Sequence, residues 1–223
     1  MQTNIHAIVI KEYTKYDEKK NNLCFIIHYY AVLSACSNGD IDDNDHHANG
    51  IHAPKNVKKI TEKDIFSSNK QNKKLSEKEM NQAIQKYLDV NSIILDNKYL
   101  MQSKLDKQSD SQNKVTDKQA KELSQLSNNA VKNDMHFKNF VKNNTLPKGY
   151  EANTERIIKY FHALNSTISD VDKSIEELNY QPQNSINVVD VPTHYAGDVN
   201  GKVQNKIKSF LNDKHIKTDV FDK

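Results

Sequence analysis

The chain has few of the residues that make tight turns: among its 223 residues there are 5 glycines and 4 prolines, and there is no tryptophan. β-sandwiches and barrels need a turn roughly every ten residues, so this scarcity disfavours them. Arginine is almost absent as well, because Arg156 is the single arginine among 32 basic residues. Arginine usually makes the bidentate contacts with phosphates and bases, and the 29 acidic residues are intermixed with the basic ones. We therefore predict no binding of nucleic acid.

A short apolar run, LCFIIHYYAVL, covers residues 23–33. It is too short to cross a bilayer as a helix, but it has the length of the apolar part of a secretory signal. Lys19 and Lys20 precede it, as the basic region of such a signal does, although Glu12 and Asp17 are unusual there. We read residues 1–35 as a signal peptide on this basis.

The run ends in Leu33-Ser34-Ala35-Cys36, which resembles the lipobox of bacterial lipoproteins: an aliphatic residue, two small residues and a cysteine. The resemblance implies transfer of a diacylglyceryl group to the Cys36 thiol and cleavage between Ala35 and Cys36. Two acyl chains on one cysteine suffice for stable membrane attachment. The expected location is the extracytoplasmic face of the cell membrane. The alternative is a buried strand that ends in a structural cysteine.

Residues 36–58 are rich in turn formers and acids and have no apolar period, so we predict a flexible tether. The segment departs from the EF-hand pattern, because Asp45 stands where glycine is required and Ile51 where the bidentate glutamate belongs. A loosely held zinc ion is the alternative, but no metal or cofactor is predicted. The side chains that suggest a metal site in this segment are Asp40, Asp42, Asp43, Asp45, His46, His47 and His52.

Helix starts mark the folded part of the chain. A capping box pairs a serine or threonine with an acid or amide three residues later, which satisfies two free N–H groups of the first turn. Apolar stripes at helical spacing follow over 80–105, 120–141 and 157–178, and short breaks separate them. The capping pairs are Ser76 with Glu79, Thr116 with Gln119 and, more weakly, Thr61 with Asp64.

We therefore predict a mainly α fold in which residues 59–181 form an antiparallel three-helix bundle, preceded by a short helix from Thr61. Residues 182–223 are expected to form a C-terminal segment that follows the bundle. It would consist of an extended segment and an amphipathic helix marked by Val203, Ile207, Phe210 and Leu211, with a second extended stretch at 216–221 that pairs with 186–191.

Asn133-Asp134-Met135-His136-Phe137 resembles the signature of the NDxxF-motif lipoproteins of Gram-positive bacteria. Together with the lipobox and the three-helix pattern, the resemblance covers most of the chain that would remain after cleavage. The resemblance implies attachment to the membrane and a helical fold. The family has no assigned biochemical activity, so the resemblance implies none for this chain.

The motif also has a physical interpretation. Asp134 occupies a stripe position, and an antiparallel register sets it level with Asn91 and beside Asn165. A buried carboxylate needs hydrogen-bond donors, so we predict a polar layer of these three side chains, with Asn133 at its edge and Phe137 sealing the next layer. Its expected role is to set helix register, as polar core residues do in coiled coils. A buried ligand site is the alternative.

No phosphate loop, zinc-binding helix motif or nucleophile elbow is present in the sequence. We predict a non-enzymatic interaction or structural module at the cell envelope, with a protein or envelope partner. A solute- or metal-binding lipoprotein is the alternative.

Overall fold

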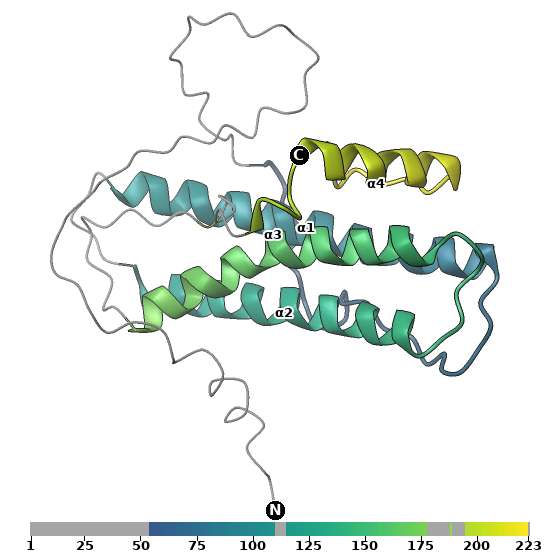
Figure 1. The fold of residues 1–223 in the computed structure, drawn as a ribbon. Helices are drawn as coiled ribbons and strands as arrows, with labels where there is room; N and C mark the ends of the chain where they lie inside the picture. Colours follow the sequence, from purple (N-terminus) through teal and green to yellow (C-terminus); the bar gives the residue numbers. More distant parts are fainter. Residues whose placement is uncertain (1–53, 110–114, 178–187, 189–194, 223) are drawn as a thin grey trace, which may run out of the picture. The chain divides into compact units, whose positions relative to one another are not determined.

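The computed structural model describes residues 54–109, 115–177, 188 and 195–222 (Figure 1). The regular structure of these residues is helical: α1 is Glu77–Ser109, α2 is Asp117–Lys142, α3 is Glu151–Glu177 and α4 is Gly201–Asp213. No strand is formed within these ranges. The expected mainly helical fold class is confirmed.

The three long helices pack as an antiparallel bundle, in which α2 contacts both α1 and α3. Just before α1, Leu75 N donates to Thr145 O, which lies just after the end of α2. Near the other ends of the same two helices, Gln119 Nε2 donates to Gln108 Oε1. The start of each helix thus lies beside the end of its neighbour in sequence, as short connections require.

The predicted helix starts are confirmed at Ser76 and Thr116. Glu79 N donates to Ser76 Oγ, and Ser76 N donates back to the Glu79 carboxylate at 2.8 Å. Thr116 and Gln119 make the same reciprocal pair at the start of α2. At both helix N-termini, side chains within four residues thus bind backbone N–H groups that have no partner inside the helix.

The helix predicted from Thr61 was wrong, because this segment makes only a single turn. Asp64 N donates to Thr61 O, and the Asp64 carboxylate accepts from Thr61 N, so the capping pair itself is present. The helix cannot continue since both polar backbone groups of Phe66 are bonded to side chains of α2 instead. These long-range contacts of Phe66 therefore end the helical turn that the local capping pair begins.

The described C-terminal residues pack on the helical bundle and add to its core. α4 packs on α3, and Asn81 Nδ2 on α1 donates to Lys214 O just after α4 ends. The predicted amphipathic helix is confirmed. The apolar side chains that α4 and its flanks add to the bundle core are Val199, Ile207, Phe210, Leu211, Ile216 and Val220.

The predicted pairing of 216–221 with 186–191 is not formed by the residues that the structure describes. Residues 216–221 make no strand. Val188, the one described residue of the other segment, instead donates its N–H to Gln102 Oε1 and accepts from Thr167 Oγ1. The rest of 186–191 lies outside the described residues. Because α1 and α3 satisfy the Val188 backbone, this residue has no polar backbone group left for a strand partner.

None of the helices in the described ranges is both long enough and apolar enough to span a bilayer.

Candidate functional site

Asp134 on α2 is the centre of a buried polar layer that joins the three long helices. Its side chain is only 7% exposed. Tyr87 Oη on α1 donates to Asp134 Oδ1 at 2.7 Å, and Asn165 Nδ2 on α3 lies 3.2 Å from each carboxylate oxygen. A carboxylate buried without donors would cost roughly several kcal/mol, so these two donors are what makes the position tolerable.

Asn91 completes the layer from α1. Its Nδ2 donates to Tyr87 O one turn earlier at 3.0 Å, and its Oδ1 accepts from Asn165 Nδ2 at 3.0 Å. Asn165 therefore bridges the amide of Asn91 and the carboxylate of Asp134. The structure brings together the three side chains that the antiparallel register predicted at one level. What the layer does stays a prediction.

His162 on α3 covers the layer from the solvent side. Its side chain is 66% exposed, and its Nδ1 lies 3.5 Å from Asp134 Oδ2. The hydrogen bond to Asp134 raises the pKa of His162, although burial opposes the shift; the charge of Lys138 lowers it and that of Asp198 raises it. Burial, followed by the Asp134 charge, raises the pKa of Tyr87 well above its ordinary value. Tyr87 therefore keeps its proton and remains a donor.

Asn133 and His136 hold the segment before α1 by its backbone. Asn133 Oδ1 accepts from Phe66 N at 3.0 Å, and His136 Nδ1 lies 2.9 Å from Phe66 O, to which it donates in the tautomer protonated at that nitrogen. The two side chains are one helical turn apart, so they reach the same residue. Asn133 thus lies at the edge of the layer and connects α2 to Phe66.

Phe137 lies one turn from Asp134 and is fully buried. Its ring stacks on Tyr87, with centroids 4.2 Å apart and planes 9° apart, and meets the Phe66 ring edge-on at 5.1 Å. The aromatic layer therefore covers the tyrosine that binds the carboxylate. Of the five motif residues, Asn133, Asp134 and Phe137 are buried, whereas Met135, at 53%, and His136 are exposed. The three buried side chains and the Nδ1 atom of His136 contact other elements of the same chain.

Tyr87 and His162 are the members of this site that sequence reasoning missed. Tyr87 belonged to the predicted apolar stripe, and the signal for its role is its position one turn before Asn91 on the same face. His162 and His136, the two histidines at this site, have different partners, since His162 contacts Asp134 and His136 contacts Phe66.

Lys98 is a second buried polar group on the α1 stripe. It is 1% exposed, and its Nζ donates to Leu164 O at 2.6 Å and to Thr167 Oγ1 at 2.9 Å. Burial lowers the pKa of Lys98 to about 7. Both acceptors are neutral, so nothing in this pair of contacts offsets the lost hydration of a positive charge.

Three further observations bear on the chemistry. The lipobox residues Leu33, Ser34, Ala35 and Cys36 lie outside the described residues, as does most of the predicted tether. In the part of the chain that is described, no group of three His, Cys, Asp or Glu side chains could hold a metal ion. The side chains of the polar layer come from three helices, and its one largely exposed member is the imidazole of His162.

Comparison of the chain with protein-family models, with curated proteins and with solved structures found no match.

Proposed function

We propose that the protein is a lipoprotein of the NDxxF-motif type, anchored to the extracytoplasmic face of the cell membrane through a diacylglyceryl group on Cys36. The single observation that carries the proposal is the sequence Leu33-Ser34-Ala35-Cys36, placed directly after an apolar run of signal-peptide length. An aliphatic residue, two small residues and cysteine at that position meet the needs of both lipid transfer and cleavage.

The length of the predicted tether suits this arrangement. Residues 37–57 lie between Cys36 and Lys58, whose carbonyl accepts a hydrogen bond from Asn97 on α1. A chain of that length with the composition of a flexible linker has a mean span of roughly 23–27 Å. The tether would hold the bundle clear of the lipid headgroups while keeping it close to the membrane surface.

We further propose that the bundle acts as a non-enzymatic interaction or structural module at the cell envelope. Support comes from the motif that suggested the family. Asn133 and His136 bind the Phe66 backbone, and Asp134 binds Tyr87 and Asn165. Side chains engaged in this way act on the fold of the chain itself, which suits a module whose outer surface meets a partner.

Labelling with a clickable palmitate analogue in a Gram-positive host tests the anchor. Cys36→Ala should abolish incorporation and leave either an unprocessed precursor or protein in the medium. Cys24→Ala is the matched control, because Cys24 lies in the same apolar run but is removed with the signal. Unchanged labelling of Cys36→Ala, or loss of labelling in Cys24→Ala alone, would refute the proposal.

A further inference from the structure

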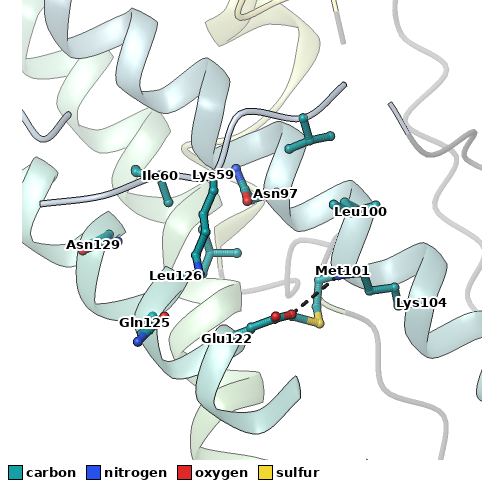
Figure 2. A pocket seen from close by; sticks show the side chains of 11 residues that line it. Lys59, Ile60, Asn97, Leu100, Met101, Lys104, Glu122, Gln125, Leu126 and Asn129 are labelled. Carbon is teal, nitrogen blue, oxygen red and sulfur yellow. Dashed lines mark ion pairs between the residues drawn. The ribbon is translucent and has the colours of Figure 1, made fainter. Parts of the chain in front are cut away.

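A pocket with a volume of about 150 Å³ lies between the segment at 57–60, α1 and α2 (Figure 2). Its apolar lining includes Ile60, Met101 and Leu126, which are all buried. The segment is held in place by Asn97 on α1, whose Nδ2 donates to Lys58 O at 2.9 Å. The pocket wall is therefore a built part of the fold, and it is separate from the layer around Asp134.

Asn129 lines this pocket and is the feature that points to a ligand. It is only 8% exposed, and no hydrogen bond joins its amide to a described residue. The amide is not among the fully buried side-chain atoms that lack a partner, which are Asn133 Nδ2, Thr154 Oγ1 and Asn165 Oδ1, so it stays open to solvent and is available to a ligand. Its Nδ2 can donate to a ligand oxygen, and its Oδ1 can accept from a ligand N–H.

The charges around the pocket favour an anionic ligand. Lys104 Nζ lies 3.5 Å from Glu122 Oε2, and this ion pair is drawn as a dashed line in Figure 2. Lys59 also lines the pocket, and within the described part of the chain it has no ion-pair partner. Two lysines and one glutamate leave a surplus of one positive charge at the rim.

The volume limits the ligand to a small one. About 150 Å³ corresponds to roughly five water molecules at about 30 Å³ each, well below the usual range for drug-sized sites. That space accepts one branched aliphatic side chain together with the polar atoms next to it.

We infer that this pocket binds an N-acylated aliphatic amino acid through its carboxylate, supplied either as a free small acid or as the C-terminal residue of a peptide. The aliphatic side chain contacts Ile60, Met101 and Leu126. The carboxylate accepts from Asn129 Nδ2 and pairs with Lys59, while the ligand amide N–H donates to Asn129 Oδ1. The inference is independent of the lipid anchor, so the failure of either proposal leaves the other standing.

Titration of the full-length chain with N-acetyl-L-leucine, followed by NMR, tests the site. A ligand of this size binds weakly, so we expect saturable shifts of the Asn129 side-chain amide with a dissociation constant on the order of 1 mM. N-acetyl-L-leucinamide, which lacks the carboxylate, should bind at least tenfold more weakly. Asn129→Asp keeps the shape of the side chain but repels the carboxylate, and it should also weaken binding at least tenfold.

Asn128→Asp is the matched control, because Asn128 is the exposed neighbour on α2 and does not line the pocket. It should leave the affinity unchanged. N-acetyl-Gly-Gly-Leu separates the two sources: tighter binding than N-acetyl-L-leucine identifies a peptide C-terminus, and equal or weaker binding identifies a free acid. The inference is overturned if no pocket resonance saturates by about 20 mM ligand, if the leucinamide binds as well as the acid, or if Asn129→Asp binds normally.

Discussion

Two polar groups are buried in the bundle, Asp134 on α2 and Lys98 on α1, and their surroundings differ. The Asp134 carboxylate accepts hydrogen bonds from a hydroxyl on α1 and an amide on α3, and an imidazole lies beside it on the solvent side. The Lys98 ammonium donates to one backbone carbonyl and one hydroxyl, which are both neutral. The first group lies in a network that spans three helices, whereas the second is a charge with no opposite charge among its hydrogen-bond partners.

The comparison indicates which buried group specifies the register of the helices and which one lowers the stability of the fold. A shifted register would separate Asp134 from Tyr87 and Asn165 and leave several polar groups unpaired. A shift at Lys98 loses less, because carbonyl and hydroxyl acceptors recur along α3. We therefore expect the Asp134 layer to stabilise the native register and Lys98 to destabilise the fold near neutral pH.

Asp134→Leu should give the largest effect. The Tyr87 hydroxyl and the Asn165 amide would lose a buried acceptor, at about 1–3 kcal/mol for each group. We expect the free energy of unfolding to fall by about 2–4 kcal/mol in urea denaturation, since the leucine side chain recovers only part of the loss. Asn128→Leu on the exposed face of α2 is the control and should stay within about 0.5 kcal/mol of the parent. A stable Asp134→Leu variant would show that the layer is dispensable.

Lys98→Met should have the opposite sign. Methionine fills a similar volume without a charge, so the free energy of unfolding at pH 7 should rise by about 1–3 kcal/mol. Lys107→Met on the exposed end of α1 is the control, with little expected change. Loss of stability in Lys98→Met would mean that the two neutral acceptors matter more than the buried charge.

The pH dependence sharpens the same point. The unfolded chain keeps the Lys98 proton up to about pH 10.5, whereas burial lowers the pKa to about 7 in the folded chain. The unfolded state therefore binds more protons between these values, and stability rises with pH across this window. The rise should be absent in Lys98→Met, as measured by urea denaturation at several pH values. An identical pH profile for the two proteins would contradict the low pKa.

His162→Gln should have the smallest effect. The raised pKa of His162 means that its contribution is fully present below about pH 6.5 and is lost as pH rises through the folded-state pKa. Because the side chain is largely exposed, we expect a loss below about 1 kcal/mol at pH 6 and none at pH 9. An equal loss at both pH values would indicate a packing role for the ring instead.

Much of the bundle could be predicted from local signals. The capping residues Ser76 and Thr116 act within four residues, so their effect is visible in the sequence. The juxtaposition of Asn91, Asp134 and Asn165 follows from short loops and helical spacing, because an antiparallel register fixes which positions share a level. Both inferences need only the geometry of ideal helices.

The remaining features depend on contacts that helix geometry does not determine. The bonds from Asn133 and His136 to Phe66 join a helix to irregular backbone 67 residues or more away in sequence, and they end the turn that begins at Thr61. The burial of Lys98 runs against the usual tendency of lysine to extend its ammonium into water. Hydrophobic pattern alone identified α4, but it could not say which face of the bundle α4 would cover.

A double-mutant cycle between Tyr87 and Asp134 tests the central claim most directly, because it isolates the contact that links α1 to the motif. Tyr87→Phe, Asp134→Leu and the double variant would be compared by urea denaturation at pH 7. We expect the double variant to lose about 1–3 kcal/mol less stability than the sum of the single variants, since each single change leaves a buried group without its partner. Additive losses, within about 0.3 kcal/mol, would contradict the account, because they would mean that the two side chains do not stabilise each other.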